Sequence, residues 1–214
     1  MIDYTETRRR MVKEQIEARG VNDQRVLKAM EKVPRHLFVP GALLDQAYDD
    51  TPLTIGHKQT ISQPYTVAFM TEALELKGNE RVLEVGAGSG YQTAVLAELA
   101  KEVFSVERIP ELAEQARQRL QEMGYKNVRI IVGDGTLGLK ANEPFDAIIV
   151  TASGPELPTP FIEQLAEGGR LVIPVGERSS QNMYRVRKQH GEVIKDYLGP
   201  FRFVELVGKF GYKE

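Results

Sequence analysis

Short apolar runs alternate with segments of helical spacing through the middle of the chain. The runs have the length and β-branched content of buried strands, and they lie at residues 81–85, 103–106, 128–132, 145–150 and 170–173. Helices are predicted between them at residues 91–100, 111–123 and 161–166. Strands that alternate with helices indicate βαβ units, whose right-handed crossovers place the strands parallel in one sheet. The pattern therefore predicts an α/β fold with a doubly wound, mostly parallel, Rossmann-like sheet and helices on both faces.

The residues before this region predict an N-terminal helical extension. A first helix is expected over 5–19, and a second begins at a cap on Asn22 or Asp23 and ends before Pro34. Residues 34–63 contain several Pro and Gly residues and few periodic apolar positions, and helical spacing returns only at 64–76. We expect a long irregular stretch over 34–63, and loops of that length inside a compact domain are usually functional.

The end of the chain loses the alternation with helices. Apolar runs at 183–188 and 192–197 are joined by His190-Gly191, which is typical of a hairpin turn, and 201–207 predicts a further strand. We therefore expect antiparallel C-terminal strands.

Length and composition narrow the possibilities. The chain has 214 residues, which suits one domain over 1–214: N-terminal helices and loop (1–76), a binding core (77–176) and C-terminal strands (177–214). It has no cysteine, so thiolate metal sites and a cysteine nucleophile are excluded. The histidines are far apart, so we expect no metal. The formal net charge of −2 gives no basic excess for a phosphate backbone, so we expect no nucleic acid partner.

The sequence shows no sign of membrane targeting. The arginines at 8–10 are not followed by the apolar region of an export signal, and no apolar run approaches the roughly 18–20 residues that span a bilayer. We expect a cytoplasmic monomer without a membrane partner.

A glycine-rich turn follows the first predicted strand of the core. Gly86, Gly88 and Gly90, with Ser89 among them, let the backbone approach a ligand closely. The third glycine comes one residue too early for the dinucleotide fingerprint, which disfavours a nicotinamide dehydrogenase. Glu84, inside the strand, would repel a pyrophosphate and attract a cation such as a sulfonium. Ser89 is a poor candidate nucleophile, since the only late histidine, His190, lies in a predicted turn.

Acidic residues follow the next two strands. Glu107, beside Arg108, lies about 20 residues after Gly86, where an acid hydrogen-bonds ribose hydroxyls. Asp134 precedes Gly135, and its carboxylate could face an exocyclic amine such as that of adenine, although turn formation explains it equally well. All these residues lie at C-terminal strand ends, where open α/β sheets bind ligands. Together they indicate S-adenosyl-L-methionine as cofactor, with S-adenosyl-L-homocysteine as product.

Several motifs give the chain a resemblance to a known family. They are Val33-Pro-Arg-His-Leu-Phe-Val-Pro40, Gln59-Thr-Ile-Ser-Gln-Pro-Tyr65, Leu83-Glu-Val-Gly-Ala-Gly-Ser-Gly-Tyr91, Gly133-Asp-Gly135 and Leu165-Ala-Glu-Gly-Gly-Arg-Leu-Val-Ile-Pro-Val-Gly176. From about residue 8 to residue 210, the chain resembles the protein-L-isoaspartate O-methyltransferases, which belong to the class I methyltransferases. Two positions depart from the family pattern: Tyr65, where the family often has His, and Glu205, where it often has Pro.

The resemblance implies a protein repair enzyme. Such enzymes methylate the free α-carboxylate of L-isoaspartyl residues in damaged peptides and proteins, and the ester proceeds through a succinimide towards normal aspartate. It also implies that Ser62 is the catalytic serine, and that Thr60 and Ile61 belong to a loop that closes over cofactor and substrate. From the residues alone, Ser62 is equally suited to be an N-cap, because it lies just before Pro64.

Two alternatives share the same fold. A nucleic acid methyltransferase is disfavoured because cytosine C5 transfer needs a cysteine, and because Val150-Thr-Ala-Ser-Gly-Pro155 stands where amino-group methylation of bases uses [DN]-P-P-[FY]. A methyltransferase acting on a small molecule remains open. A binding module without catalysis would have no use for both a cofactor pocket and the segment at residues 59–64.

Overall fold

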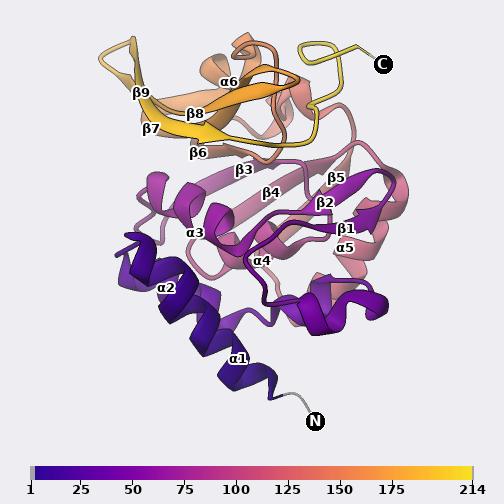
Figure 1. Ribbon diagram of the computed structural model, residues 1–214. Helices are drawn as coiled ribbons and strands as arrows, with labels where there is room; N and C mark the ends of the chain where they lie inside the picture. The colour runs from indigo at the N-terminus through magenta and orange to yellow at the C-terminus, as the bar shows by residue number, and fades with distance from the viewer. Residues whose placement is uncertain (1–2, 214) are drawn as a thin grey trace.

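A single twisted sheet forms the centre of the computed structural model, which describes residues 3–213 (Figure 1). Its strands stand in the order β5-β4-β3-β6-β7-β8-β9. They are β3 (Arg81–Val85), β4 (Glu102–Glu107), β5 (Val128–Val132), β6 (Phe145–Val150), β7 (Leu165–Glu177), β8 (Ser180–Gln189) and β9 (Glu192–Phe201). Strands β5 to β7 pair in parallel, as predicted. The chain moves outward from β3 to β5 and then returns to β6 beside β3, so the order reverses between β3 and β6.

The C-terminal strands extend the same sheet. Both β7–β8 and β8–β9 are antiparallel, and the predicted turn at His190-Gly191 is confirmed, since both residues have positive φ. The further strand expected over 201–207 is wrong. Phe201 ends β9, and the chain then leaves the sheet edge to lie beside Ser153, making only the isolated bridge Ser153–Glu205 and, further on, one between Val207 and Tyr212.

Side chains on the two faces of the sheet belong to two separate apolar clusters, because successive residues of a strand point to opposite faces. Helices α1 to α5 contribute to the first cluster, and α6 with the segment near Leu206 covers the second. The helices are α1 (Tyr4–Met11), α2 (Gln24–Lys32), α3 (Pro64–Ala73), α4 (Tyr91–Ala97), α5 (Pro110–Glu122) and α6 (Thr159–Gln164). The first predicted helix continues beyond α1 as a π-helical turn and a 3₁₀ turn, up to Gly20. None of the described helices is long and apolar enough to cross a membrane.

Residues 34–63 are more regular than predicted. They form two 3₁₀ helices, Arg35–Phe38 and Gly41–Gln46, and then a hairpin of β1 (Leu53–Gly56) and β2 (Gln59–Ile61). The hairpin is short and not strongly apolar, which explains why the sequence pattern did not indicate it. It lies in front of the parallel sheet in Figure 1, across from the C-terminal ends of the central strands.

Candidate active site

A pocket opens at the C-terminal ends of β3, β4 and β6, where the strand order reverses. One side, which we call the glycine-loop wall, consists of residues 85–89, 91, 106–108, 135 and 151–152. The opposite side, the hairpin wall, consists of residues 59–62 and 204–207. The empty space between them, including the solvent at its open mouth, is about 770 Å³. The reversal point of an open α/β sheet is where such ligands bind.

The turn after β3 needs glycine at Gly86. Its φ is +98°, and a Cβ there would lie 2.4 Å from Thr151 Oγ1. The Thr151 hydroxyl lies 3.0 Å from the carbonyl oxygen of Val85 and 2.7 Å from that of Gly86, so it closes the turn against the end of β6. The backbone of the loop therefore faces the pocket without side chains that would fill it.

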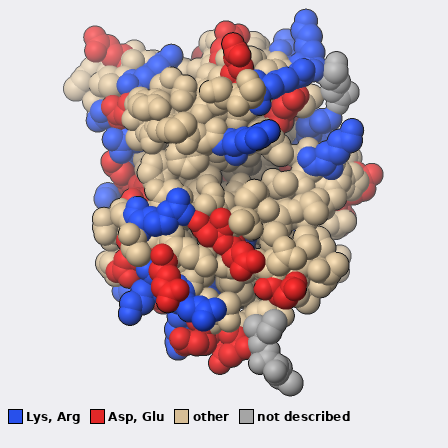
Figure 2. Space-filling model, in the orientation of Figure 1, with Lys and Arg blue, Asp and Glu red and all other residues tan. Residues whose placement is uncertain are grey.

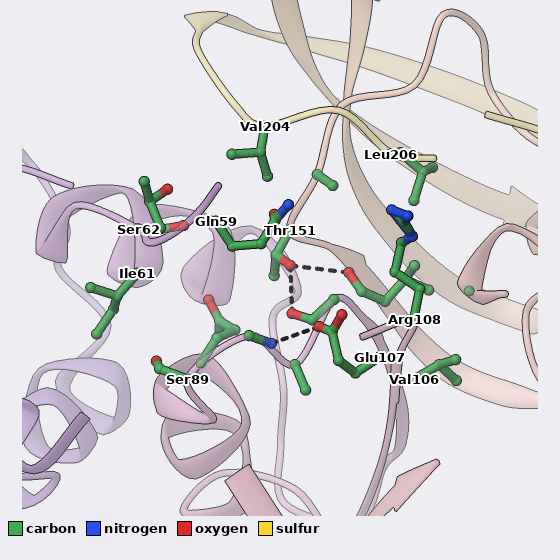
Figure 3. Close-up of a pocket in the computed structure, with 18 of the residues that line it drawn as sticks. Gln59, Ile61, Ser62, Ser89, Val106, Glu107, Arg108, Thr151, Val204 and Leu206 are labelled. Atoms are coloured by element: carbon green, nitrogen blue, oxygen red, sulfur yellow. Dashed lines mark hydrogen bonds between the residues drawn. The ribbon is translucent and has the colours of Figure 1, made fainter. Parts of the chain in front are cut away.

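Glu107 supports this loop from the next strand. Its Oε2 accepts a hydrogen bond from Gly88 N at 2.9 Å, and its Oε1 accepts one from Ile109 N at 3.0 Å. The side chain is almost buried but lines the pocket, beside Arg108 (Figure 3). The predicted ribose-binding acid thus lies at the expected place and also holds the glycine loop.

Glu84 does not face the pocket, contrary to our expectation. It alternates with Val85 along β3, so it points to the opposite face, where Thr93 Oγ1 donates to Glu84 Oε2 at 2.5 Å. Complete burial raises the pKa of Glu84 to about 8, although Ser105 and Thr93 act in the opposite direction. At neutral pH the group is mostly protonated, and it supplies no full negative charge to a cationic ligand.

Asp134 is also turned away from the pocket, which Gly135 lines in its place. One carboxylate oxygen accepts from Thr136 N at 2.9 Å and the other from Lys209 N at 2.9 Å, so the side chain ties the turn after β5 to the C-terminal segment. Burial opposes ionisation, but these hydrogen bonds outweigh it and hold the pKa of Asp134 below its usual value. The turn-forming interpretation of this residue describes its contacts here.

Ser89 is engaged in helix α4 and in a contact with α5. Its Oγ accepts from Tyr91 N at 3.3 Å, and its carbonyl oxygen accepts from Arg119 at 2.6 Å. His190 lies exposed in the β8–β9 turn, so it is not placed as a catalytic partner of Ser89. These contacts agree with a structural role for Ser89 in shaping the loop.

Thr60, Ile61 and Ser62 all lie on the hairpin wall, and Figure 3 shows Ile61 and Ser62 there. Ile61 is buried at the end of β2, whereas Thr60 is exposed and Ser62 half-buried. The hairpin lies against the glycine loop, since Ile55 Cδ1 would be 3.4 Å from a Cβ on Gly88. The residues at 59–62 and the glycine loop therefore face each other across one pocket.

The structure separates the two interpretations of Ser62. Helix α3 has Gln63 at its cap position, without a capping hydrogen bond from that side chain. Asp50 takes over this role from a distant loop: its Oδ1 accepts from Tyr65 N at 3.1 Å, and its Oδ2 accepts from Gln63 Nε2 at 2.6 Å and from Arg19. Because Asp50 caps the helix, the Ser62 hydroxyl is not committed to it.

Of the two residues that depart from the family pattern, Glu205 lines the pocket and Tyr65 lies in the first turn of α3. The Arg19 guanidinium stacks 3.7 Å from the centre of the Tyr65 ring. Glu205, on the hairpin wall, forms an ion pair with Arg178 at 2.9 Å.

The sequence patterns did not indicate several residues in and around the pocket. Thr151 could have been found, because it directly follows β6 and strand ends at this edge bind ligands. Asp50 and the segment 204–207 reach the site through long-range contacts that no local motif indicated.

The arrangement has the features of one class of proteins. A glycine loop at the reversal point, an acid after the next strand and an antiparallel end to the sheet define a class I methyltransferase that uses S-adenosyl-L-methionine. The side-chain-free surface at Gly86 and Gly88, with Glu107 beside it, fits a nucleoside of that kind.

Comparisons with known proteins identify the family. The family model for protein-L-isoaspartate(D-aspartate) O-methyltransferase matches residues 6–211, and the chain belongs to this family. It is 57% identical over 213 residues to protein-L-isoaspartate O-methyltransferase 1 of Syntrophobacter fumaroxidans, with 100% of both chains covered. It is 58% identical over 212 residues to the enzyme of Syntrophus aciditrophicus, with 98% and 97% covered.

Solved structures agree with this assignment. A protein-L-isoaspartate O-methyltransferase superposes with a TM-score of 0.85 at 30% identity, covering 95% of this chain and 67% of the other. A Plasmodium falciparum protein assigned to the same activity, in complex with S-adenosyl-L-homocysteine, gives a TM-score of 0.82 at 30% identity, covering 94% and 98%.

Proposed function

We propose that this chain is a protein repair methyltransferase, which transfers the methyl group of S-adenosyl-L-methionine to the free α-carboxylate of L-isoaspartyl residues in peptides and proteins. Membership of the family supports the activity. The observation that carries it is the position of Ser62, which faces the glycine loop across the pocket while Asp50 caps the helix behind it. The ester product proceeds through a succinimide towards normal aspartate.

The two walls of the pocket have different roles in this proposal. The bound cofactor supplies a methyl group on a sulfonium. Glu107 binds the ribose hydroxyls, and the loop from Gly86 to Gly90 with Arg108 and Gly135 surrounds the rest of the cofactor. Thr60 and Ile61 cover it from the hairpin side, and the Ser62 hydroxyl orients the substrate carboxylate. Asp134 and Glu84 do not contact the cofactor. They stabilise the segments that carry the residues lining the pocket.

The chain needs no general base for this reaction. A carboxylate has an ordinary pKa of about 3.9, so the substrate oxygen is already charged at neutral pH. What the protein supplies is alignment, which can contribute roughly 7–11 kcal/mol to lowering the barrier, together with exclusion of water by the hairpin wall. Ser62 thus positions the substrate and forms no covalent bond with it.

The partner we propose is a damaged polypeptide of varied sequence, bound by a monomer. Lys and Arg side chains are interspersed with Asp and Glu on the face shown in Figure 2, around a depression with largely uncharged walls. An interspersed surface suits substrates of either charge and offers little to a polyanion such as nucleic acid. We expect a monomeric mass of 24.0 kDa by light scattering.

A matched peptide pair tests the proposed activity. The protein is incubated with methyl-labelled S-adenosyl-L-methionine and two peptides that differ only in an isoaspartyl or an aspartyl linkage. We expect base-labile label on the isoaspartyl peptide alone. Equal label on both peptides, or none on either, would contradict the proposal, and transfer to a nucleic acid or a small molecule would support one of the alternatives.

A further inference from the structure

Arg35 is a completely buried arginine that forms no direct ion pair within the described residues, although the charge of Asp50 acts on it. Its relative exposure is 0%, its Nε donates to the carbonyl oxygen of Ala47 at 2.8 Å, and one terminal nitrogen donates to that of Thr51 at 3.4 Å. The other terminal nitrogen has no hydrogen-bond partner. Burial lowers the pKa of Arg35 to about 10, so the group remains charged at neutral pH. A buried charge of this kind is unfavourable for folding, which suggests that it serves another purpose.

The Arg35 side chain contacts the glycine-loop wall through Tyr91. Its guanidinium carbon lies 5.0 Å from the centre of the Tyr91 ring, and Tyr91 is the first residue of α4, directly after Gly90. Phe38, in the same 3₁₀ helix, packs edge-on against Tyr91 at 5.4 Å. The 3₁₀ helix Arg35–Phe38 therefore packs against the residue that directly follows the glycine loop.

The same side chain also contacts the segment that leads into the hairpin. The carbonyls of Ala47 and Thr51 bracket Asp50, the residue that caps α3 next to Ser62. Thr51 is separated from β1 by Pro52 alone, and β1 pairs with the strand that carries Thr60 and Ile61. Arg35 thus joins the backbone of residues 47–51, which lead into the hairpin, to an aromatic ring of the glycine-loop wall.

We propose that Arg35 is a positioning residue that couples the glycine loop to the hairpin wall, so that cofactor binding at the loop orders the segment carrying Thr60, Ile61 and Ser62. The proposal rests on the proposed function for its cofactor. Its direct contacts are with neutral groups: backbone carbonyls and a ring face hold the guanidinium at two points, and the nearby charge of Asp50 favours its charged form without a direct ion pair. A displacement of Tyr91 is then transmitted to residues 47–51.

Hydrogen exchange with S-adenosyl-L-homocysteine tests this coupling without any methyl acceptor. In the unsubstituted protein, the ligand should slow amide exchange both in the glycine loop and at residues 53–61. In Arg35→Met, protection of 53–61 should be largely lost, and the Kd of the ligand should rise about tenfold, which corresponds to about 1.4 kcal/mol.

Arg25→Met is the matched control. Arg25 also donates to two backbone carbonyls, those of Leu76 and Leu99, but lies outside the pocket. The Arg25→Met variant should have lower thermal stability, but its Kd for S-adenosyl-L-homocysteine and its protection of residues 53–61 should not change. Arg35→Lys, which retains a charge but not the planar donor set, should restore part of the protection and keeps the test possible if Arg35→Met fails to fold.

Three results would overturn the proposal. The first is that the ligand does not slow amide exchange at residues 53–61 of the unsubstituted protein. The second is that Arg35→Met keeps the same protection of 53–61 as the unsubstituted protein. The third is that Arg25→Met loses this protection as Arg35→Met does. Failure of the isoaspartyl assay with normal protection would instead contradict the proposed function alone, since this experiment uses no peptide.

Discussion

The two walls of the pocket are built in opposite ways. The glycine-loop wall comes from consecutive strand ends of one parallel sheet, and each of its turns is fixed by contacts with a neighbouring strand, such as Thr151 with Gly86. The hairpin wall combines residues 59–62 with residues 204–207, which lie far apart in the chain. The comparison indicates a division of labour. In our proposal, the sheet provides a preformed cofactor site, and the hairpin brings the substrate contacts to it.

Gly86→Ala should have the largest effect, because it damages the preformed wall itself. The new Cβ would meet Thr151 Oγ1 at a positive φ, and strain of this kind is of order 1–3 kcal/mol. We expect the Kd of S-adenosyl-L-homocysteine, measured by calorimetry, to rise about 100-fold, equivalent to about 2.7 kcal/mol.

Gly124→Ala is the control for backbone strain. Gly124 also has a positive φ, +83°, but a Cβ there meets nothing within 4 Å and lies away from the pocket. It should destabilise the fold yet bind the ligand normally. Equal binding by the two variants would show that the steric fit at Gly86 is irrelevant to the cofactor.

Glu107→Gln should have the next largest effect. The amide keeps one acceptor but cannot accept from both Gly88 N and Ile109 N while binding ribose hydroxyls. We expect the Kd of S-adenosyl-L-homocysteine to rise about tenfold. The exposed Glu111→Gln, in the first turn of α5, should leave it unchanged.

Complete removal of the Glu107 side chain is more disruptive than its sequence context indicates. Glu107→Ala would leave two backbone amides without their acceptor, and each such loss amounts to about 1–3 kcal/mol. Chemical denaturation should therefore show lower stability. Unchanged affinity and stability would refute the role of Glu107 in both ribose binding and loop support.

Glu84→Gln should affect pH dependence more than binding. The folded-state pKa of Glu84 is raised to about 8, so the folded protein binds more protons than the unfolded chain between about pH 5 and pH 8. This group therefore favours folding at low pH, and its contribution is lost as the pH rises, by at most about 1.4 kcal/mol per pH unit.

Denaturation curves at about pH 5 and pH 9 measure this contribution. Relative to the unsubstituted protein, Glu84→Gln should gain stability at the higher pH, while its affinity for S-adenosyl-L-homocysteine stays within about twofold. A stability difference between the two proteins that does not change with pH would show that Glu84 ionises normally in the folded state.

The sequence was informative where local patterns determine the structure. The strands at 81–85, 128–132 and 145–150 have the predicted bounds, because each is a short, mainly apolar run with clear turn residues around it. The glycine loop and Glu107 were found for the same reason. The direction of the Glu84 side chain depends on strand alternation, and that of Asp134 depends on a contact with Lys209. The spacing of residues within a motif indicates neither.

The hairpin wall could be predicted only through the resemblance to the family. Its strands are four and three residues long and weakly apolar, so their pairing depends on tertiary contacts. The cap of α3 illustrates the difference. Local sequence offered Ser62 as the capping residue, whereas the fold brings in Asp50 from another loop to accept a hydrogen bond from Tyr65 N.

Ser62→Ala tests the central claim most directly, namely that the hairpin wall acts on the substrate and the glycine-loop wall on the cofactor. Turnover of an isoaspartyl peptide and the Kd of S-adenosyl-L-homocysteine should be measured on the same preparation, with Asp50→Ala as the control that loses about 1 kcal/mol of stability with the helix cap. We predict that Ser62→Ala keeps its melting temperature and its Kd but loses about 90% or more of kcat, equivalent to at least about 1.4 kcal/mol. Full turnover, or a loss explained by weaker cofactor binding or lower stability, would contradict the account.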